Sequence, residues 1–293
     1  SIESQVDTVE FRELLNTPGP VLLDGATGSN LMLRGRPRGV CAEQWALEHP
    51  DIVIALQTEY VQAGSQIIYA PTFGANRVGL GMYDLAGDLA AINRDLVALS
   101  RQAAGGRAFV AGDMTTIGKP ADYAELIDLY TEQAQALLDA DVDLFVIETM
   151  MGLEETQAAL EAVRMLCELP VLCSLSFAAD GQAFFGGGAA DAAEVLEALG
   201  ADAVGVNCSV GPDQMEAMIR TMAAHAAIPI LAKPNAGMPE IGDDGSVHYS
   251  MDADHFARSM GTLLQAGARV IGGCCGTTPA YIEKLRAAYC AML

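Results

Sequence analysis

The sequence alternates between two kinds of segment, and this alternation constrains the fold more than any other feature. Eight short apolar runs each carry a polar residue, a glycine or a cysteine within their last three positions, and longer segments of helical periodicity lie between them. The apolar runs are residues 20–26, 66–72, 108–114, 143–149, 170–177, 203–209, 229–235 and 270–276. The helical segments are residues 50–64, 84–104, 121–141, 153–168, 189–199, 212–227, 252–267 and 279–292.

The apolar runs do not alternate with polar residues, which is typical of parallel strands that are covered on both faces. Eight strand–helix pairs in 293 residues predict the α/β class and a single (β/α)8 TIM barrel. The segment Asp24–Gly28 after the first run lacks the G-x-G-x-x-G pattern, which disfavours a doubly wound sheet. Because no linker or low-complexity stretch divides the chain, we expect one barrel domain over residues 1–293.

Charge and cysteine usage limit the classes of partner and the compartment. A net charge of −22 repels phosphate backbones and anionic lipids, so we expect neither a nucleic acid nor a membrane surface as partner. The start Ser1–Gln5 is polar and lacks the features of a signal peptide. Seven cysteines, an odd number, argue against a disulfide framework, and we expect a cytoplasmic protein.

The predicted barrel turns the ends of the apolar runs into a list of candidate site residues. In TIM barrels the catalytic groups lie at the C-terminal ends of the strands and in the loops that follow. Here those positions hold Asp24, Thr72, Asp113, Glu148, Asn207, Cys208, Lys233, Asn235, Cys274 and Cys275.

Three of these candidates are thiols. Cys208 closes the sixth run, and the adjacent Cys274 and Cys275 close the eighth. A catalytic zinc site uses three protein ligands, among them thiolates, and leaves a fourth position open. Space-filling cysteines are the alternative interpretation, and we apply it to the four that do not lie at a strand end. These four are Cys41, Cys167, Cys173 and Cys290.

The segments around the three thiols resemble a known family. Gly205–Cys208 and Gly272–Pro279 are similar to the zinc signature of the homocysteine S-methyltransferase family, which includes cobalamin-dependent methionine synthase and betaine–homocysteine methyltransferase. The likeness is greatest to the homocysteine-binding domain of methionine synthase, through Asn207–Pro212 and Pro234–Gly237. Further similar segments, which extend the resemblance over essentially the whole chain, are Leu23–Gly28, His49–Val53, Tyr60–Gly64, Thr72–Asn76 and Ile147–Thr149.

The resemblance implies a zinc-dependent S-methyltransferase. Cys208, Cys274 and Cys275 would hold zinc and form the catalytic centre, where a thiol, L-homocysteine, would be activated as a zinc thiolate and methylated to methionine. The implied methyl donor is a methylcorrinoid, either free or as methylcobalamin on a partner protein.

The resemblance also implies a substrate site beside the metal. Asp24 and Glu148 would hold the ammonium group of the amino-acid substrate. Asn235 corresponds to a family position that approaches zinc when substrate is absent, and a turn residue is its alternative interpretation.

Other functions remain open at this point. The donor could be S-methylmethionine or a betaine-type compound, and residues 112–118 depart from the Gly-Pro-Thr loop that methionine synthases usually carry. Lys233 at a strand end could serve a Schiff-base lyase or aldolase. A non-catalytic, zinc-bound barrel is the third alternative.

Overall fold

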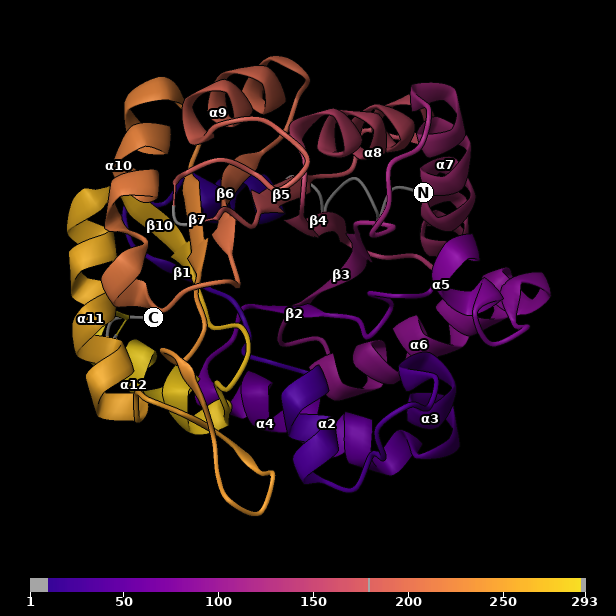
Figure 1. The fold of residues 1–293 in the computed structure, drawn as a ribbon, viewed down its shortest axis with the longest axis horizontal. Coiled ribbons are helices and arrows are strands. Elements are labelled where there is room, and N and C mark those ends of the chain that lie inside the picture. Colours follow the sequence, from indigo (N-terminus) through magenta and orange to yellow (C-terminus); the bar gives the residue numbers. More distant parts are fainter. Residues whose placement is uncertain (1–9, 179, 291–293) are drawn as a thin grey trace.

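The structure is a computed structural model that describes residues 10–178 and 180–290. Eight parallel strands form a barrel with helices around it, which confirms the predicted TIM barrel (Figure 1). Along the sheet the strands follow the order β1–β10–β7–β6–β5–β4–β3–β2. They are β1 (Val21–Leu22), β2 (Ile67–Tyr69), β3 (Phe109–Thr115), β4 (Leu144–Met150), β5 (Val171–Leu175), β6 (Ala203–Asn207), β7 (Ile230–Lys233) and β10 (Ala268–Ile271).

The first and last strands in this order, β1 and β2, close the barrel through Gln66. The Gln66 main-chain N–H donates to the Leu22 carbonyl oxygen at 2.8 Å. Its side-chain Oε1 accepts from the Leu22 N–H at 3.0 Å. One glutamine therefore satisfies both main-chain groups of Leu22 where the two strands are too short for a regular ladder.

The predicted helices are present, with ends that differ by a few residues. Proline in the first turn begins α4 and α12, and Gly64 and Gly267, both with positive φ, end α4 and α11. The helices are α4 (Pro50–Ala63), α6 (Leu89–Ala104), α7 (Tyr123–Asp139), α8 (Leu153–Leu166), α9 (Ala189–Ala198), α10 (Glu216–His225), α11 (Ala253–Ala266) and α12 (Pro279–Tyr289). The last two residues of the predicted segment 279–292 and the start Ser1–Gln5 lie outside the described residues.

The structure adds short elements that the periodicity did not predict. All follow strands β1, β2, β6 or β7, so they surround the C-terminal mouth of the barrel, and most have too few residues to show a hydrophobic period. The 3₁₀ turns η1 and η2 also shorten two predicted helical segments at their starts. The added elements are α2 (Gly28–Leu33), α3 (Ala42–Glu48), α5 (Arg77–Gly81), η1 (Ala86–Asp88), η2 (Pro212–Gln214), β8 (Pro239–Ile241) and β9 (Val247–Tyr249).

Two apolar clusters divide the core. The larger lies between the strands and the surrounding helices, and the smaller fills the barrel interior and includes Phe11 and Leu15 from the helical residues 10–15. Along β4, Leu144 and Val146 point inward, so the side chain of Glu148 also points inward. The same alternation follows Leu231 with Lys233 on β7. The barrel interior thus changes from apolar to charged over two residues along each of these strands.

No helix in the described ranges has the length and apolar character needed to cross a membrane. That the whole of residues 1–293 is one domain remains a prediction.

Candidate functional site

A cavity of about 380 Å³ opens at the C-terminal mouth of the barrel. Six of the candidate residues for which the sequence suggested a function line this cavity: Asp24, Glu148, Cys208, Lys233, Cys274 and Cys275. Asn235 does not line the cavity; it is buried beside it, and its main-chain N–H donates to the Val210 carbonyl at 3.0 Å. Asp113, for which the sequence suggested no role, does line the cavity.

The three thiols converge from two loops. The Sγ atoms of Cys208, Cys274 and Cys275 all lie within 4.8 Å of one another, and those of Cys208 and Cys275 are 4.0 Å apart. Cys208 directly follows β6 and adopts a left-handed φ of 61°, an unfavourable conformation for a residue with a Cβ. The Cys274 N–H donates to the Pro234 carbonyl at 2.7 Å and the Ala236 N–H donates to the Cys275 carbonyl at 3.0 Å, which connects the second loop to the segment directly after β7. The fold therefore holds the thiols together at the expense of local strain.

The packing of the thiols disfavours their ionisation. A hydrogen bond with Cys274 lowers the pKa of Cys208. The contact with Cys275 and burial together raise it by more, so the pKa is raised to about 11. A hydrogen bond with Cys208 lowers the pKa of Cys275. The contact with Cys274 and burial outweigh it and raise the pKa to about 12. For Cys274 a hydrogen bond with Cys208 and burial raise the pKa as well. A bound cation would remove this penalty, since it compensates the negative charges directly.

The donor set fits zinc. Zinc–sulfur bonds of about 2.3 Å in a tetrahedron place the sulfurs about 3.8 Å apart, so the present separations need only small side-chain adjustments. Among residues 10–178 and 180–290, this is the one group of three His, Cys, Asp or Glu side chains close enough to share an ion. The three thiols thus form a candidate metal centre with room in the cavity for a further ligand.

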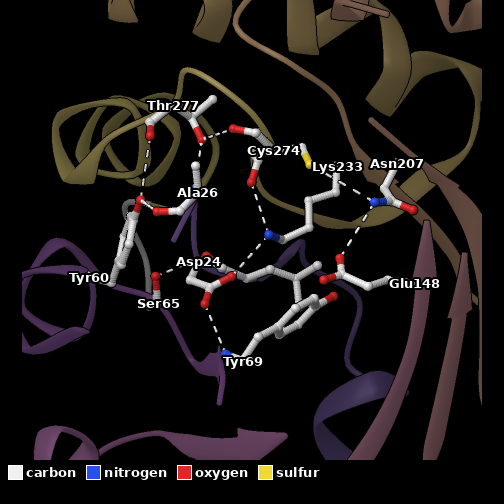
Figure 2. Close-up of polar contacts among 12 residues, drawn as sticks. Asp24, Ala26, Tyr60, Ser65, Tyr69, Glu148, Asn207, Lys233, Cys274 and Thr277 are labelled. Atoms are coloured by element: carbon white, nitrogen blue, oxygen red, sulfur yellow. Dashed lines mark hydrogen bonds and ion pairs between the residues drawn. The ribbon is translucent and has the colours of Figure 1, made fainter. Parts of the chain in front are cut away.

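Lys233 and Asp24 form a buried ion pair below the thiols (Figure 2). Lys233 Nζ lies 3.1 Å from Asp24 Oδ1 and donates to the Gly273 carbonyl at 2.9 Å. The Tyr69 N–H donates to Asp24 Oδ2 at 2.9 Å, and the Tyr69 ring lies 4.5 Å from Nζ. Burial lowers the pKa of Lys233, but Asp24, Glu148 and Cys274 raise it further, so the net direction is upward. A lysine held as the ammonium ion is not a nucleophile, which disfavours the Schiff-base alternative.

Asn207 connects the buried acid Glu148 with the thiols (Figure 2). Its Nδ2 donates to Thr149 Oγ1 at 2.8 Å and lies 3.5 Å from Glu148 Oε2 and 4.0 Å from Cys274 Sγ. Its Oδ1 accepts from the Thr149 N–H at 2.8 Å and from Ser174 Oγ at 2.7 Å. These bonds fix the amide, and with it the position of the Glu148 carboxylate. The sequence marked Asn207 as a strand-end residue but gave no sign of this bridging position.

Asp113 is a second buried acid beside Glu148. It lies inside β3, so the first four residues of the segment 112–118, discussed above as a loop, belong to a strand. Burial first, and then the charge and hydrogen bond of Glu148, raise the pKa of Asp113 well above its usual range. Its position at the end of an apolar run was the only signal in the sequence.

The sequence of the chain is similar to one protein family and to curated relatives. A sequence model described as homocysteine S-methyltransferase matches residues 21–289. The chain is 32% identical over 289 residues to the methionine synthase of Mycobacterium tuberculosis, covering 90% of this chain and 24% of that protein. It is 30% identical to the methionine synthase of Mycobacterium leprae over the same coverage. The chain therefore spans about a quarter of the length of these curated relatives.

A solved structure gives the same fold. The metallated form of the homocysteine methyltransferase MmuM from Escherichia coli aligns with a TM-score of 0.83. The alignment covers 94% of this chain and 99% of that one at 24% sequence identity. At this level of identity the likeness is evidence for the fold.

Proposed function

The chain belongs to the homocysteine S-methyltransferase family and is a methyltransferase, and from this premise we propose that it methylates the thiol of L-homocysteine to give methionine. The resemblance drawn from the sequence is confirmed at the level of the family. The observation that carries the proposal is the cluster of three thiols within 4.8 Å at the mouth of a cavity that also contains buried carboxylates.

We assign Cys208, Cys274 and Cys275 as the zinc ligands and the catalytic centre. Zinc held there would supply the positive charge that keeps a substrate thiol deprotonated at neutral pH. The chain itself places the thiols and holds the amino-acid end of the substrate. In the transfer, a sulfur–carbon bond forms to the methyl group while the donor leaves with the electron pair of its own bond.

Glu148 is the better placed of the two predicted ammonium-binding residues. Its carboxylate is oriented by Asn207 and lines the cavity. Asp24 also lines the cavity, but Lys233 and the Tyr69 N–H already contact its two oxygens. We therefore propose that Asp24 acts on the substrate mainly by positioning Lys233 and Tyr69. Asn235 stays a candidate that could approach the metal centre from the adjacent loop.

For the methyl donor we favour a methylcorrinoid, free or carried by a partner protein. Support comes from the resemblance of the sequence to cobalamin-dependent methionine synthase and from the apolar side chains exposed on the loops after the strands, which suit the docking of a large partner. Examples are Phe73, Phe184, Phe185, Met238 and Ile241. The aromatic content of 6% gives little support for the cage that a betaine-type donor needs.

The test is methionine formation from homocysteine by the zinc-loaded protein, with methylcobalamin or S-methylmethionine supplied in parallel. We expect turnover with methylcobalamin. Turnover with S-methylmethionine alone would replace the proposed donor and keep the acceptor. Protein that holds zinc but forms no methionine with either donor, and binds no thiol, would support the non-catalytic barrel instead.

A further inference from the structure

We infer that Asp113 is a substrate-binding residue that receives the ammonium group of the amino-acid thiol together with Glu148 and the Tyr69 hydroxyl. This inference rests on the proposed function and specifies its substrate class: thiols that carry a primary ammonium group, rather than thiols in general.

The main chain around Asp113 is fixed from both sides. Thr72 Oγ1 accepts from the Asp113 N–H at 3.0 Å and donates to the Asp113 carbonyl at 2.8 Å. Gln133 Nε2 donates to the Thr72 carbonyl at 2.9 Å, which holds the threonine in turn. The inward pleat of β3 then directs the carboxyl group toward the interior, where it lines the cavity. Its position is therefore determined by the barrel and does not depend on a mobile loop.

Two buried oxygens at this end of the cavity lack a hydrogen-bond partner among the described residues: Asp113 Oδ1 and the Tyr69 hydroxyl. Asp113 is only 4% exposed and Tyr69 equally so. A buried polar atom without a hydrogen-bond partner is unfavourable, and a ligand that supplies the missing hydrogen bond removes this penalty. Asp24 Oδ1 also has no hydrogen bond of good geometry, but it contacts the Lys233 ammonium.

The distribution of charge favours a cation at this point. Asp24, Asp113 and Glu148 are all buried in the same cavity, whereas the ammonium of Lys233 is already held by Asp24 and the Gly273 carbonyl. Asp113 and Glu148 are therefore two neighbouring acidic side chains without a cation of their own, because Lys233 is paired with Asp24. A ligand that brings a positive charge relieves their repulsion, and a neutral or anionic group does not.

The acceptors also match a primary ammonium group in number. Such a group has three N–H donors. Asp113 Oδ1, the Glu148 carboxylate and the Tyr69 hydroxyl oxygen supply three acceptors from β3, β4 and β2. Tyr69 lines the same cavity as these carboxylates. Burial first, and then the charges of Glu148, Asp24 and Asp113, raise the pKa of its hydroxyl.

The experiment compares two thiols by isothermal titration calorimetry on the zinc-loaded full chain. L-homocysteine carries the ammonium group, and 4-mercaptobutanoate is the same molecule without it. We expect Asp113→Asn to weaken homocysteine binding about 10-fold or more, as for loss of a charge-assisted hydrogen bond, and to leave 4-mercaptobutanoate binding within about twofold. Asp128→Asn, an exposed residue on α7, is the matched control and should change neither.

An equal change for both thiols, or no change, would overturn the assignment of Asp113 and leave the proposed function intact. Wild-type protein that binds neither thiol would overturn the proposed function itself. If Asp113→Asn fails to fold, Tyr69→Phe gives the same comparison, because it removes one acceptor and keeps the ring. Selective weakening of homocysteine binding in that variant supports the ammonium site, and unselective weakening contradicts it.

Discussion

The two ends of the barrel interior are built on the same strands and differ in what they bury. At the N-terminal end, inward-facing Val146 and Leu231 pack in an apolar cluster that Phe11 helps to close. Two residues further along, the inward positions hold Glu148 and Lys233. Apolar burial stabilises the fold, whereas buried charges reduce stability unless they are paired. The fold therefore depends on the apolar end of the barrel interior, and the chemistry depends on the charged end.

The largest expected effect concerns activity alone. Replacing Cys208, Cys274 or Cys275 by alanine should lower the rate of methyl transfer by more than about 100-fold. Loss of a residue that only supports a metal ligand costs up to about 100-fold, and loss of the ligand itself should cost more. The melting temperature of the metal-free protein should change little, since the core lies at the other end. Zinc content, turnover and thermal unfolding measure this. Full activity in any of the three variants would remove that cysteine from the site.

A large loss of stability is expected at the charged end when one charge is left alone. Lys233→Met should destabilise the protein by about 3–5 kcal/mol, because Asp24 would stay buried without its cation. The double variant Asp24→Asn with Lys233→Met should be less destabilised than Lys233→Met by itself. Urea unfolding of these two variants and of the single variant Asp24→Asn tests this, and additive losses would show that the two side chains do not interact.

At the apolar end a truncation should affect stability without affecting the site. Leu144→Ala removes a fully buried side chain of the interior cluster and should cost about 2–5 kcal/mol. Homocysteine affinity of the folded fraction should match the wild type. A loss of affinity comparable to the loss of about 10-fold expected for Asp113→Asn would contradict the division between the two ends.

The smallest effect should be a gain of stability with a defined pH dependence. Since the pKa of Asp113 is raised in the folded protein, its protonated form favours folding below the unfolded carboxyl pKa, and this contribution is lost as the pH rises toward the folded value. Asp113→Asn should therefore stabilise the protein near pH 7 by about 0.5–2 kcal/mol, the usual gain when a functional site is relaxed. The gain should shrink as the pH falls toward 4. Denaturant unfolding at several pH values measures it, and a loss of stability at pH 7 would contradict it.

Much of the fold was predictable from the sequence, because parallel buried strands leave an unbroken apolar signature and each run could be counted. The short helices α2, α3 and α5 and the hairpin β8–β9 were not, since one or two turns at a barrel mouth are stabilised by the loops they contact. The gathering of the strand-end thiols was also foreseeable, because every strand end of a barrel faces one mouth.

The buried ion pair in the site could not be predicted from the sequence. Asp24 and Lys233 lie far apart in the sequence, and only the closed barrel brings Lys233 Nζ to 3.1 Å from Asp24 Oδ1. For the same reason the family resemblance gave a role to Asp24, while Asp113 was a strand-end candidate without a role. Which acid keeps an oxygen without a hydrogen-bond partner depends on contacts made by different strands.

The most direct test of the central claim is X-ray absorption at the zinc edge of the loaded protein, recorded with and without L-homocysteine. We predict three sulfur neighbours at about 2.3 Å in the absence of substrate and four in its presence. Two or fewer sulfur neighbours without substrate, or an unchanged number with it, would contradict a three-thiol site that receives the substrate sulfur.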